Sequence, residues 1–169
     1  MPRLTAARLH KLLHYDPKNG IFTWRSINGR SKMHVGDVAG VINNRNGHRV
    51  IGIDYRMYGA SRLAFLYMQG RWPSAEIDHR NCNPSDNRWH NLRPATRSQN
   101  SQNTSIQKRK KEKQIPKGVG WHKHLKKYRA YIGLNGRHIS LGYFDDPNKA
   151  HAAYVNAAKK YFGKFARAR

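Results

Sequence analysis

One segment of the chain, EIDHRNCNPSDNRWHNLRPATRSQNSQN at residues 76–103, gathers aspartate, histidine and asparagine side chains around a turn-rich loop. This concentration stands out because the whole chain of 169 residues contains only 9 Asp and Glu. Carboxylate and amide oxygens suit hard divalent cations, and an imidazole can accept a proton at neutral pH. The neighbours Asp78 and His79 could therefore join a metal ligand to a general base, although such a pair alone is also common as a surface hydrogen bond.

The cysteine content narrows the kinds of metal site that the chain can form. Cys82 is the only cysteine, which excludes an internal disulfide and a structural zinc held by cysteine pairs. A metal ion would therefore be bound by oxygen and nitrogen ligands.

The charge balance points to a polyanionic partner. There are 33 Lys and Arg against 9 Asp and Glu, which gives a formal net charge of +24. Since neutralised phosphates release counterions, binding to nucleic acid should weaken strongly as the salt concentration rises. An anionic membrane is the rival partner, but no stretch approaches the roughly 20 apolar residues of a membrane span, and the start MPRLTAARLH has no hydrophobic signal region. We therefore expect a soluble, intracellular protein that binds nucleic acid and no membrane.

Helices and turns upstream of this segment must position it. Leucines recur at helical spacing in LTAARLHKLLHYD, with Thr5 as the expected N-cap. A strand is expected at 20–24, and two strands joined by a turn at Asn46-Gly47 are expected within 39–54. A second helix is expected over 60–70, where the final glycine ends it.

A polar stretch divides the chain. Residues 106–116 have no apolar period and carry a run of like charge from Lys108 to Lys111. Two compatible interpretations stay open, a solvated linker and a flexible arm along the phosphate backbone. Beyond it, strand-like alternation over 117–144 and a stripe of small residues over 147–162 predict three strands followed by a helix.

The order DH, NLR and QN..N within 76–103, preceded by SRLAFLYMQGRWP at 61–73, resembles the HNH endonucleases of phages and introns. The resemblance spans roughly residues 1–105. It implies a two-stranded hairpin followed by a helix, wrapped around one divalent ion. By the same resemblance the first strand bears Asp78 and His79, the second Asn91 and the helix Asn100.

The resemblance also implies a task for each of these residues. His79 would be the general base for the attacking water, and Asn91 would accept a hydrogen bond from the protonated ring nitrogen of His79 and so fix its tautomer. Asp78 and Asn100 would bind one Mg²⁺ or Mn²⁺, which polarises the scissile phosphate and stabilises the departing 3′ oxygen. Catalysis is thus expected from His79 and Asn91, and metal binding from Asp78 and Asn100.

This chain departs from the family pattern at the third letter of the motif. That position is usually His, whereas this chain has Asn100, as in the subgroup with an Asn there, and weaker metal binding would follow. Two alternative assignments of these roles stay open, although each departs from the spacing of the family motif. Asn103 is an alternative metal ligand to Asn100, and Asn87 is an alternative to Asn91.

Residues 117–166 resemble an AP2 DNA-binding domain, on the motifs GVGW, YRAYI, LGYF and YFGKFA. In that family a three-stranded sheet lies in the major groove and a helix packs behind it. Alternation along the strands predicts that Val119, Ala130, Ile132, Ile139 and Leu141 face the helix. Expected on the DNA face are His122, Arg129, Tyr131, His138 and Ser140, and expected near phosphates at the strand ends are Lys117, His124 and Arg137. Some positions that are Arg or Trp in plant members differ here, so no target sequence is implied.

The expected fold class is α+β, with three parts. They are an HNH nuclease domain at 1–105 with its ββα-metal motif at 76–103, a basic linker at 106–116, and an AP2-like sheet and helix at 117–169. The expected function is that of a phage-type homing endonuclease that nicks or cuts double-stranded DNA at a site chosen with the C-terminal domain. It would act as a monomer on DNA, with a dimer left open, in the cytoplasm or nucleoid of a bacterial host. A non-catalytic DNA-binding regulator and a phage DNA-packaging accessory protein stay open as alternatives.

Overall fold

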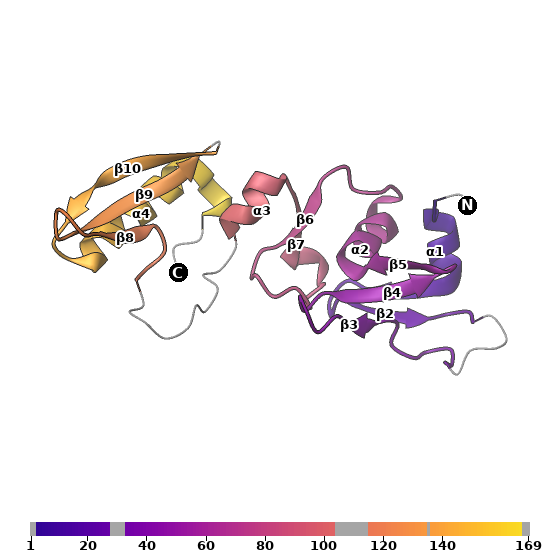
Figure 1. Cartoon of the computed structure of the whole chain (residues 1–169). Coiled ribbons are helices and arrows are strands. Elements are labelled where there is room, and N and C mark those ends of the chain that lie inside the picture. The colour runs from indigo at the N-terminus through magenta and orange to yellow at the C-terminus, as the bar shows by residue number, and fades with distance from the viewer. Residues whose placement is uncertain (1–2, 28–32, 104–114, 135, 167–169) are drawn as a thin grey trace. The chain divides into compact units, whose positions relative to one another are not determined.

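The computed structural model describes residues 3–27, 33–103, 115–134 and 136–166, and it combines short helices with small antiparallel sheets (Figure 1). The chain divides into two compact units, residues 1–96 and 97–169. Residues 106–114 of the predicted linker lie outside the described residues. No helix within the described ranges is long and apolar enough to cross a membrane.

The first unit opens with α1 (Ala6–Leu12), and the side chain of Thr5 accepts a hydrogen bond from the backbone N–H of Arg8 at 3.2 Å. The predicted N-cap is thus confirmed. The helix ends earlier than the leucine spacing predicts, because β1 (Leu13–Asp16) follows directly and pairs antiparallel with β2 (Ile21–Trp24). Leu13 and Tyr15 are buried at alternate positions of β1, which is the burial pattern of a strand. Pairing with β2 therefore favours this pattern over the helical spacing of the leucines.

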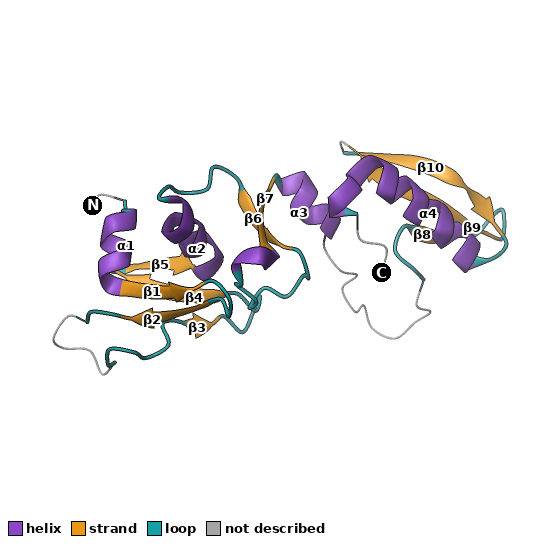
Figure 2. Ribbon diagram, turned by 180° about the vertical axis from the view of Figure 1, so that it is seen from behind, coloured by secondary structure: helices purple, strands orange, loops and turns teal. Residues whose placement is uncertain are grey.

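A second sheet in this unit has the order β3-β4-β5, formed by β3 (Val41–Ile42), β4 (Arg49–Ile53) and β5 (Arg56–Gly59). The Asn46-Gly47 turn joins β3 to β4 as predicted, whereas β5 was not predicted. α2 (Ala60–Gln69) follows and ends at Gly70, whose φ of 68° is the left-handed conformation that glycine favours. α2 contacts α1, β4 and β5, so the two helices and this sheet enclose one core (Figure 2).

Large apolar side chains from these elements fill that core, and burying them supplies most of the driving force for folding. The largest fully buried ones are Tyr15, Phe22, Leu9, Leu13, Ile51, Leu63 and Leu66. The rings of Tyr15 and Phe22 stack with their centroids 4.6 Å apart. This core supports the short hairpin that carries the segment singled out above.

That hairpin consists of β6 (Glu76–His79) and β7 (Leu92–Ala95), which pair antiparallel, with the short 3-10 helix η1 (Trp89–Asn91) before β7. The ring of Trp89 lies 4.8 Å from that of Phe65 on α2, which ties η1 to the core. Two strands occur where they were predicted. Asn91, however, is the last residue of η1 and not part of the second strand.

The second unit includes α3 (Arg97–Asn103), which contacts the short helix η2 (Gly163–Phe165) near the C-terminus. Along the chain α3 follows β7, and the two compact units divide after Thr96. The ββα-metal motif and the domain bounds 1–105, 106–116 and 117–169 stay predictions.

The rest of the second unit is a three-stranded antiparallel sheet of order β10-β9-β8 with one long helix. The strands are β8 (Val119–His122), β9 (Lys127–Leu134) and β10 (Arg137–Phe144). α4 (Pro147–Phe162) lies across one face of this sheet (Figure 2), and Asp146 caps its first turn by accepting a hydrogen bond from Asn148 N–H. Three strands followed by a helix is the order that the sequence predicts.

Most of the residues predicted to face this helix do so. Val119, Ala130 and Ile132 are buried, and Leu141 packs against the same clusters. Ile139 is 37% exposed, although it pairs with Ile132. Its pairing with buried Ile132 places Ile139 on the face toward α4, as predicted, and its exposure arises because β10 is an edge strand.

Candidate active site

Asp78 and Arg93 form a buried ion pair across the β6–β7 hairpin. The two residues are register partners, and Arg93 Nε donates to Asp78 Oδ2 at 2.6 Å. Their side chains are 3% and 7% exposed. A carboxylate so removed from water needs a partner of opposite charge, and the arginine supplies both the charge and a short hydrogen bond.

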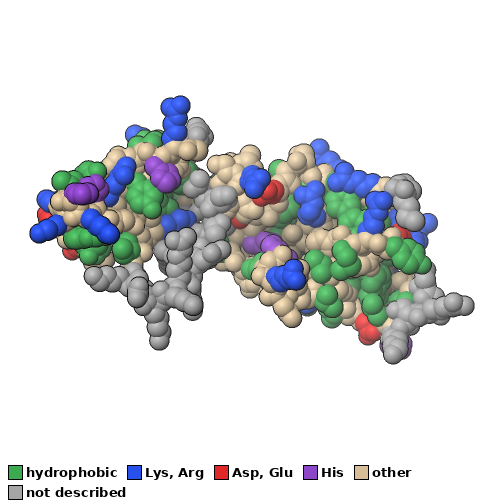
Figure 3. All heavy atoms as spheres, viewed as in Figure 1, with side chains coloured by type: hydrophobic (Ala, Val, Ile, Leu, Met, Phe, Trp, Pro, Cys, Tyr) green, Lys and Arg blue, Asp and Glu red, His purple; other side chains and the backbone are tan. Residues whose placement is uncertain are grey.

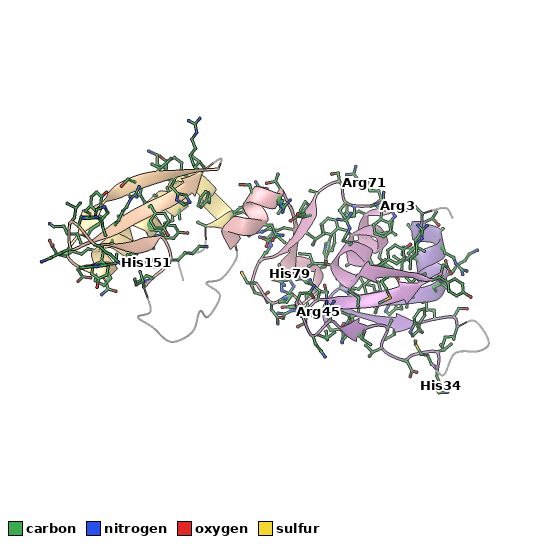
Figure 4. All side chains as sticks on the ribbon, viewed as in Figure 1. Arg3, His34, Arg45, Arg71, His79 and His151 are labelled. Atoms are coloured by element: carbon green, nitrogen blue, oxygen red, sulfur yellow. The ribbon has the colours of Figure 1, made fainter. Side chains whose placement is uncertain are left out.

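His79, the next residue on β6, is 5% exposed, and its Nε2 lies 3.4 Å from Oδ1 of Asn87 (Figure 4). The orientation of the Asn87 amide follows from its other hydrogen bond, since Nδ2 donates to the carbonyl oxygen of Ser85 at 3.1 Å. An amide oxygen can only accept, so the ring proton of neutral His79 is on Nε2 and the lone pair is on Nδ1.

The charge state of His79 follows from its burial. Desolvation lowers the pKa of His79 below the ordinary value of 6.5, and the hydrogen bond with Asn87 opposes this effect only in part. The imidazole is consequently neutral at pH 7, which is the form that a general base requires.

Asn91 does not take the place beside His79 that the family resemblance implies. Its Oδ1 accepts from the backbone N–H of Asn81 at 3.1 Å, and its Nδ2 donates to Asn81 Oδ1 and to the carbonyl oxygen of Asp86. Asn87, which the sequence analysis left open as an alternative, is the amide at the His79 ring. Asn91 instead ties together the two ends of the loop between β6 and β7.

The remainder of this loop is held by a network around Asp86. Its carboxylate accepts hydrogen bonds from Arg88 Nε at 2.8 Å and from Asn81 Nδ2 at 2.7 Å. These partners, the Arg88 side chain foremost, lower the pKa of Asp86 to about 2. Asn83 caps a further turn by accepting from the backbone N–H of Ser85. The loop is thus fixed by many side-chain hydrogen bonds of its own.

The β1–β2 hairpin supports the loop from outside. The Tyr15 hydroxyl donates to the carbonyl oxygen of Asn87 at 2.6 Å, and Trp89 N–H donates to the carbonyl oxygen of Pro17 at 3.0 Å. A Cβ on Gly20 would lie 2.4 Å from the backbone nitrogen of Arg88, and the φ of Gly20 is +77°. Sequence reasoning missed these supports. The Asn19-Gly20 pair indicates a turn at this place, but the sequence does not show which loop the turn contacts.

Among the described residues, Asp78 is the carboxylate next to His79 on β6. The described residues contain no group of three or more His, Cys, Asp or Glu that could hold a metal ion by themselves. Mg²⁺ is often bound through one or two carboxylates together with water and substrate phosphate oxygens. Asp78 would be the protein carboxylate of such a site. Asn100 lies half-buried on α3 in the second unit, and its role as a ligand stays a prediction, as does the alternative Asn103.

In the second unit the strand register places the expected DNA-contacting side chains together. His122, Arg129, Tyr131, His138 and Ser140 pair with one another or alternate with buried residues, so they lie on the face opposite α4. A shallow pocket on this face is lined by Gly120, Trp121, His122, Arg129, Tyr131 and His138. Arg129 Nε is buried and has no hydrogen-bond partner among the described residues. We call this surface the open sheet face.

The three residues expected near phosphates lie at strand ends. His124, in the β8–β9 turn, and Arg137, at the start of β10, are exposed, and Lys117 is half-buried just before β8. On the face of the molecule seen in Figure 3, Lys and Arg side chains are scattered over both units and few acidic ones are visible. The roles of these residues in DNA binding stay predictions.

Comparison with known proteins identifies a matching family. Residues 58–102 match the family model of the HNH endonucleases. No curated protein and no solved structure matches the chain. The matched segment runs from β5 through α2, β6 and β7 into α3, so it contains the Asp78–Arg93 pair, His79 and the loop that holds them. The match supports an HNH nuclease domain in this part of the chain, with DNA as its substrate.

Proposed function

We propose that this chain is a metal-dependent DNA endonuclease of the HNH type, which hydrolyses phosphodiester bonds. The observation that carries the proposal is the buried, neutral His79 beside Asp78 at the end of β6, within the residues that match the family. A neutral imidazole next to a carboxylate combines the base and the cation ligand that phosphodiester hydrolysis needs.

His79 acts as the general base in this proposal. Asn87 holds the proton of the neutral ring on Nε2, so Nδ1 is the atom that accepts a proton from the attacking water. Tyr15 and the loop network fix Asn87 in turn. Burial raises the pKa of the Tyr15 hydroxyl, which therefore stays protonated and keeps donating. The base is thus oriented by a chain of contacts from the core.

Asp78, with Asn100 as the predicted second ligand, would hold the metal. A bound Mg²⁺ or Mn²⁺ would supply Lewis acidity at the scissile phosphate and stabilise the leaving 3′ oxygen. Arg93 balances the charge of Asp78 and holds its carboxylate in one orientation. Asn91 contributes by closing the loop and not by contacting the base.

The second unit would select the cutting site as an AP2-like DNA-binding domain. Its support is the sheet-and-helix architecture and the cluster of His, Arg and Tyr on the open sheet face. One candidate active site per chain favours nicking one strand, so a double-strand break would need two copies or two events. The proposed setting is that of a phage-type homing endonuclease acting inside a bacterial host.

The test is relaxation of supercoiled plasmid by the purified full chain with Mg²⁺ or Mn²⁺. We expect nicked product that disappears with EDTA and with His79→Ala, while DNA binding by that variant stays unchanged. His90→Ala is the matched control, because His90 is an exposed histidine beside the same loop. Binding without cleavage under every condition would instead favour a non-catalytic DNA-binding regulator.

A further inference from the structure

A second histidine lies at the candidate active site but outside the residues that match the family. The ring of His48 is centred 5.5 Å from that of His79, with an angle of 56° between the planes. This falls within the range of 4.5–7 Å in which aromatic rings attract one another. His48 precedes β4, whereas the family match begins at residue 58.

The backbone of the β3–β4 turn fixes the position of His48. Its carbonyl oxygen accepts from Asn43 N–H at 2.8 Å, and its own N–H donates to Asn46 Oδ1 at 3.1 Å. Gly47 has a φ of +72°, and a Cβ there would lie 2.9 Å from Cγ of Pro84 in the β6–β7 loop. The turn therefore abuts the loop of the candidate active site, and His48 is held against it.

Asn87 and His48 both contact the ring of His79. Asn87 holds its Nε2 edge by a hydrogen bond, and the His48 ring packs beside it. The His48 ring is half-buried, and burial lowers its pKa, so it packs as an uncharged ring near neutral pH. A hydrogen bond restrains one edge of a ring, whereas ring packing restrains the tilt of its plane.

We propose that His48 is a positioning residue of the nuclease site, whose ring packs against His79 and, together with the Asn87 hydrogen bond, fixes the direction of the His79 Nδ1 lone pair. The inference rests on the proposed nuclease function and extends the site to the turn between β3 and β4. The contribution comes from the ring as a packing surface, so a phenyl ring should replace it in large part.

The test compares His48→Ala and His48→Phe in the full chain, with His14→Ala on β1 as the matched control, since His14 is exposed. We expect His48→Ala to lower kcat about tenfold with KM unchanged, and His48→Phe to stay within about threefold of the parent. His14→Ala should change neither value. In the metal-free protein, the NMR resonances of the His79 ring should move in His48→Ala and move less in His48→Phe.

The outcomes distinguish a failure of the positioning role of His48 from a failure of the proposed nuclease function. A parent chain that cleaves, with His48→Ala equal to it in kcat and in the His79 resonances, overturns the positioning role. If His48→Phe is as impaired as His48→Ala, a ring nitrogen of His48 acts directly and packing is not the cause. A folded parent that never cleaves overturns the proposed nuclease function and the positioning role with it, even where the NMR arm still reports the ring contact.

Discussion

Replacing Arg93 by methionine would remove one partner of the buried Asp78–Arg93 pair and keep an apolar stem of similar length. The remaining carboxylate is 3% exposed and would lose its 2.6 Å hydrogen bond. Breaking a buried ion pair in this way costs about 3–5 kcal/mol. Because both side chains are so little exposed, solvent screening reduces this free-energy cost only slightly. We therefore expect the first unit to lose about 3 kcal/mol of its free energy of unfolding.

The assay is urea denaturation in EDTA, so that no metal ion replaces the guanidinium group. Three of the four tryptophans are in the first unit, and a Trp121→Phe background makes fluorescence report on that unit alone. With an m-value of about 1–3 kcal/mol per M, the midpoint should fall by about 1 M or more. The double variant Asp78→Leu/Arg93→Met, which replaces both charges by apolar groups, should recover most of the loss.

A midpoint for Arg93→Met within about 0.3 M of the parent would refute this reasoning, because the carboxylate would then not depend on Arg93. A double variant no more stable than Arg93→Met would refute it as well, since the cost would then lie in lost packing and not in an unpaired charge.

Tyr15→Phe leaves the carbonyl oxygen of Asn87 without its 2.6 Å donor and should lower stability by about 1–2 kcal/mol in the same urea assay; an unchanged midpoint would contradict this. Because burial lowers the pKa of His79 from 6.5, the neutral form of the ring persists below that pH. At saturating Mg²⁺, kcat should therefore stay constant through pH 6.5 and fall only at lower pH. A fall in kcat with its midpoint above pH 6.5 would contradict this. Arg129→Ala should weaken DNA binding by about 1–3 kcal/mol, whereas Lys159→Ala on α4 should leave binding nearly unchanged; equal effects would rule out the open sheet face.

Elements with a strong local signal could be predicted from the sequence. Thr5 caps α1, and Gly70 ends α2 in the left-handed conformation. The Asn46-Gly47 pair marks the β3–β4 turn. By contrast, Leu13 fits a helical stripe and a strand equally well, and only pairing with β2 decides between them. Short strands such as β5 depend on their neighbours in the same way.

In the candidate site, the residue types could be predicted from the sequence, but not every contact between them. Asp78 and His79 occupy one strand as expected, because the motif fixes their order along the chain. Asn87 and Asn91 are the same residue type four positions apart, and which of them meets His79 depends on how the loop closes around Asp86. Nothing in the sequence connects His48 to His79, because that contact arises from the packing of two distant turns.

In the proposed mechanism, His79 and a divalent cation together cleave DNA. The most direct measurement is to map cut ends on both strands of a long natural DNA after incubation with the parent chain or with His79→Ala, in Mg²⁺ and in EDTA. We expect defined ends with a 3′ hydroxyl from the parent in Mg²⁺, on one strand or on both, and none in EDTA or from the variant. The same ends from His79→Ala, or no ends from a folded parent that binds the DNA, would contradict this mechanism.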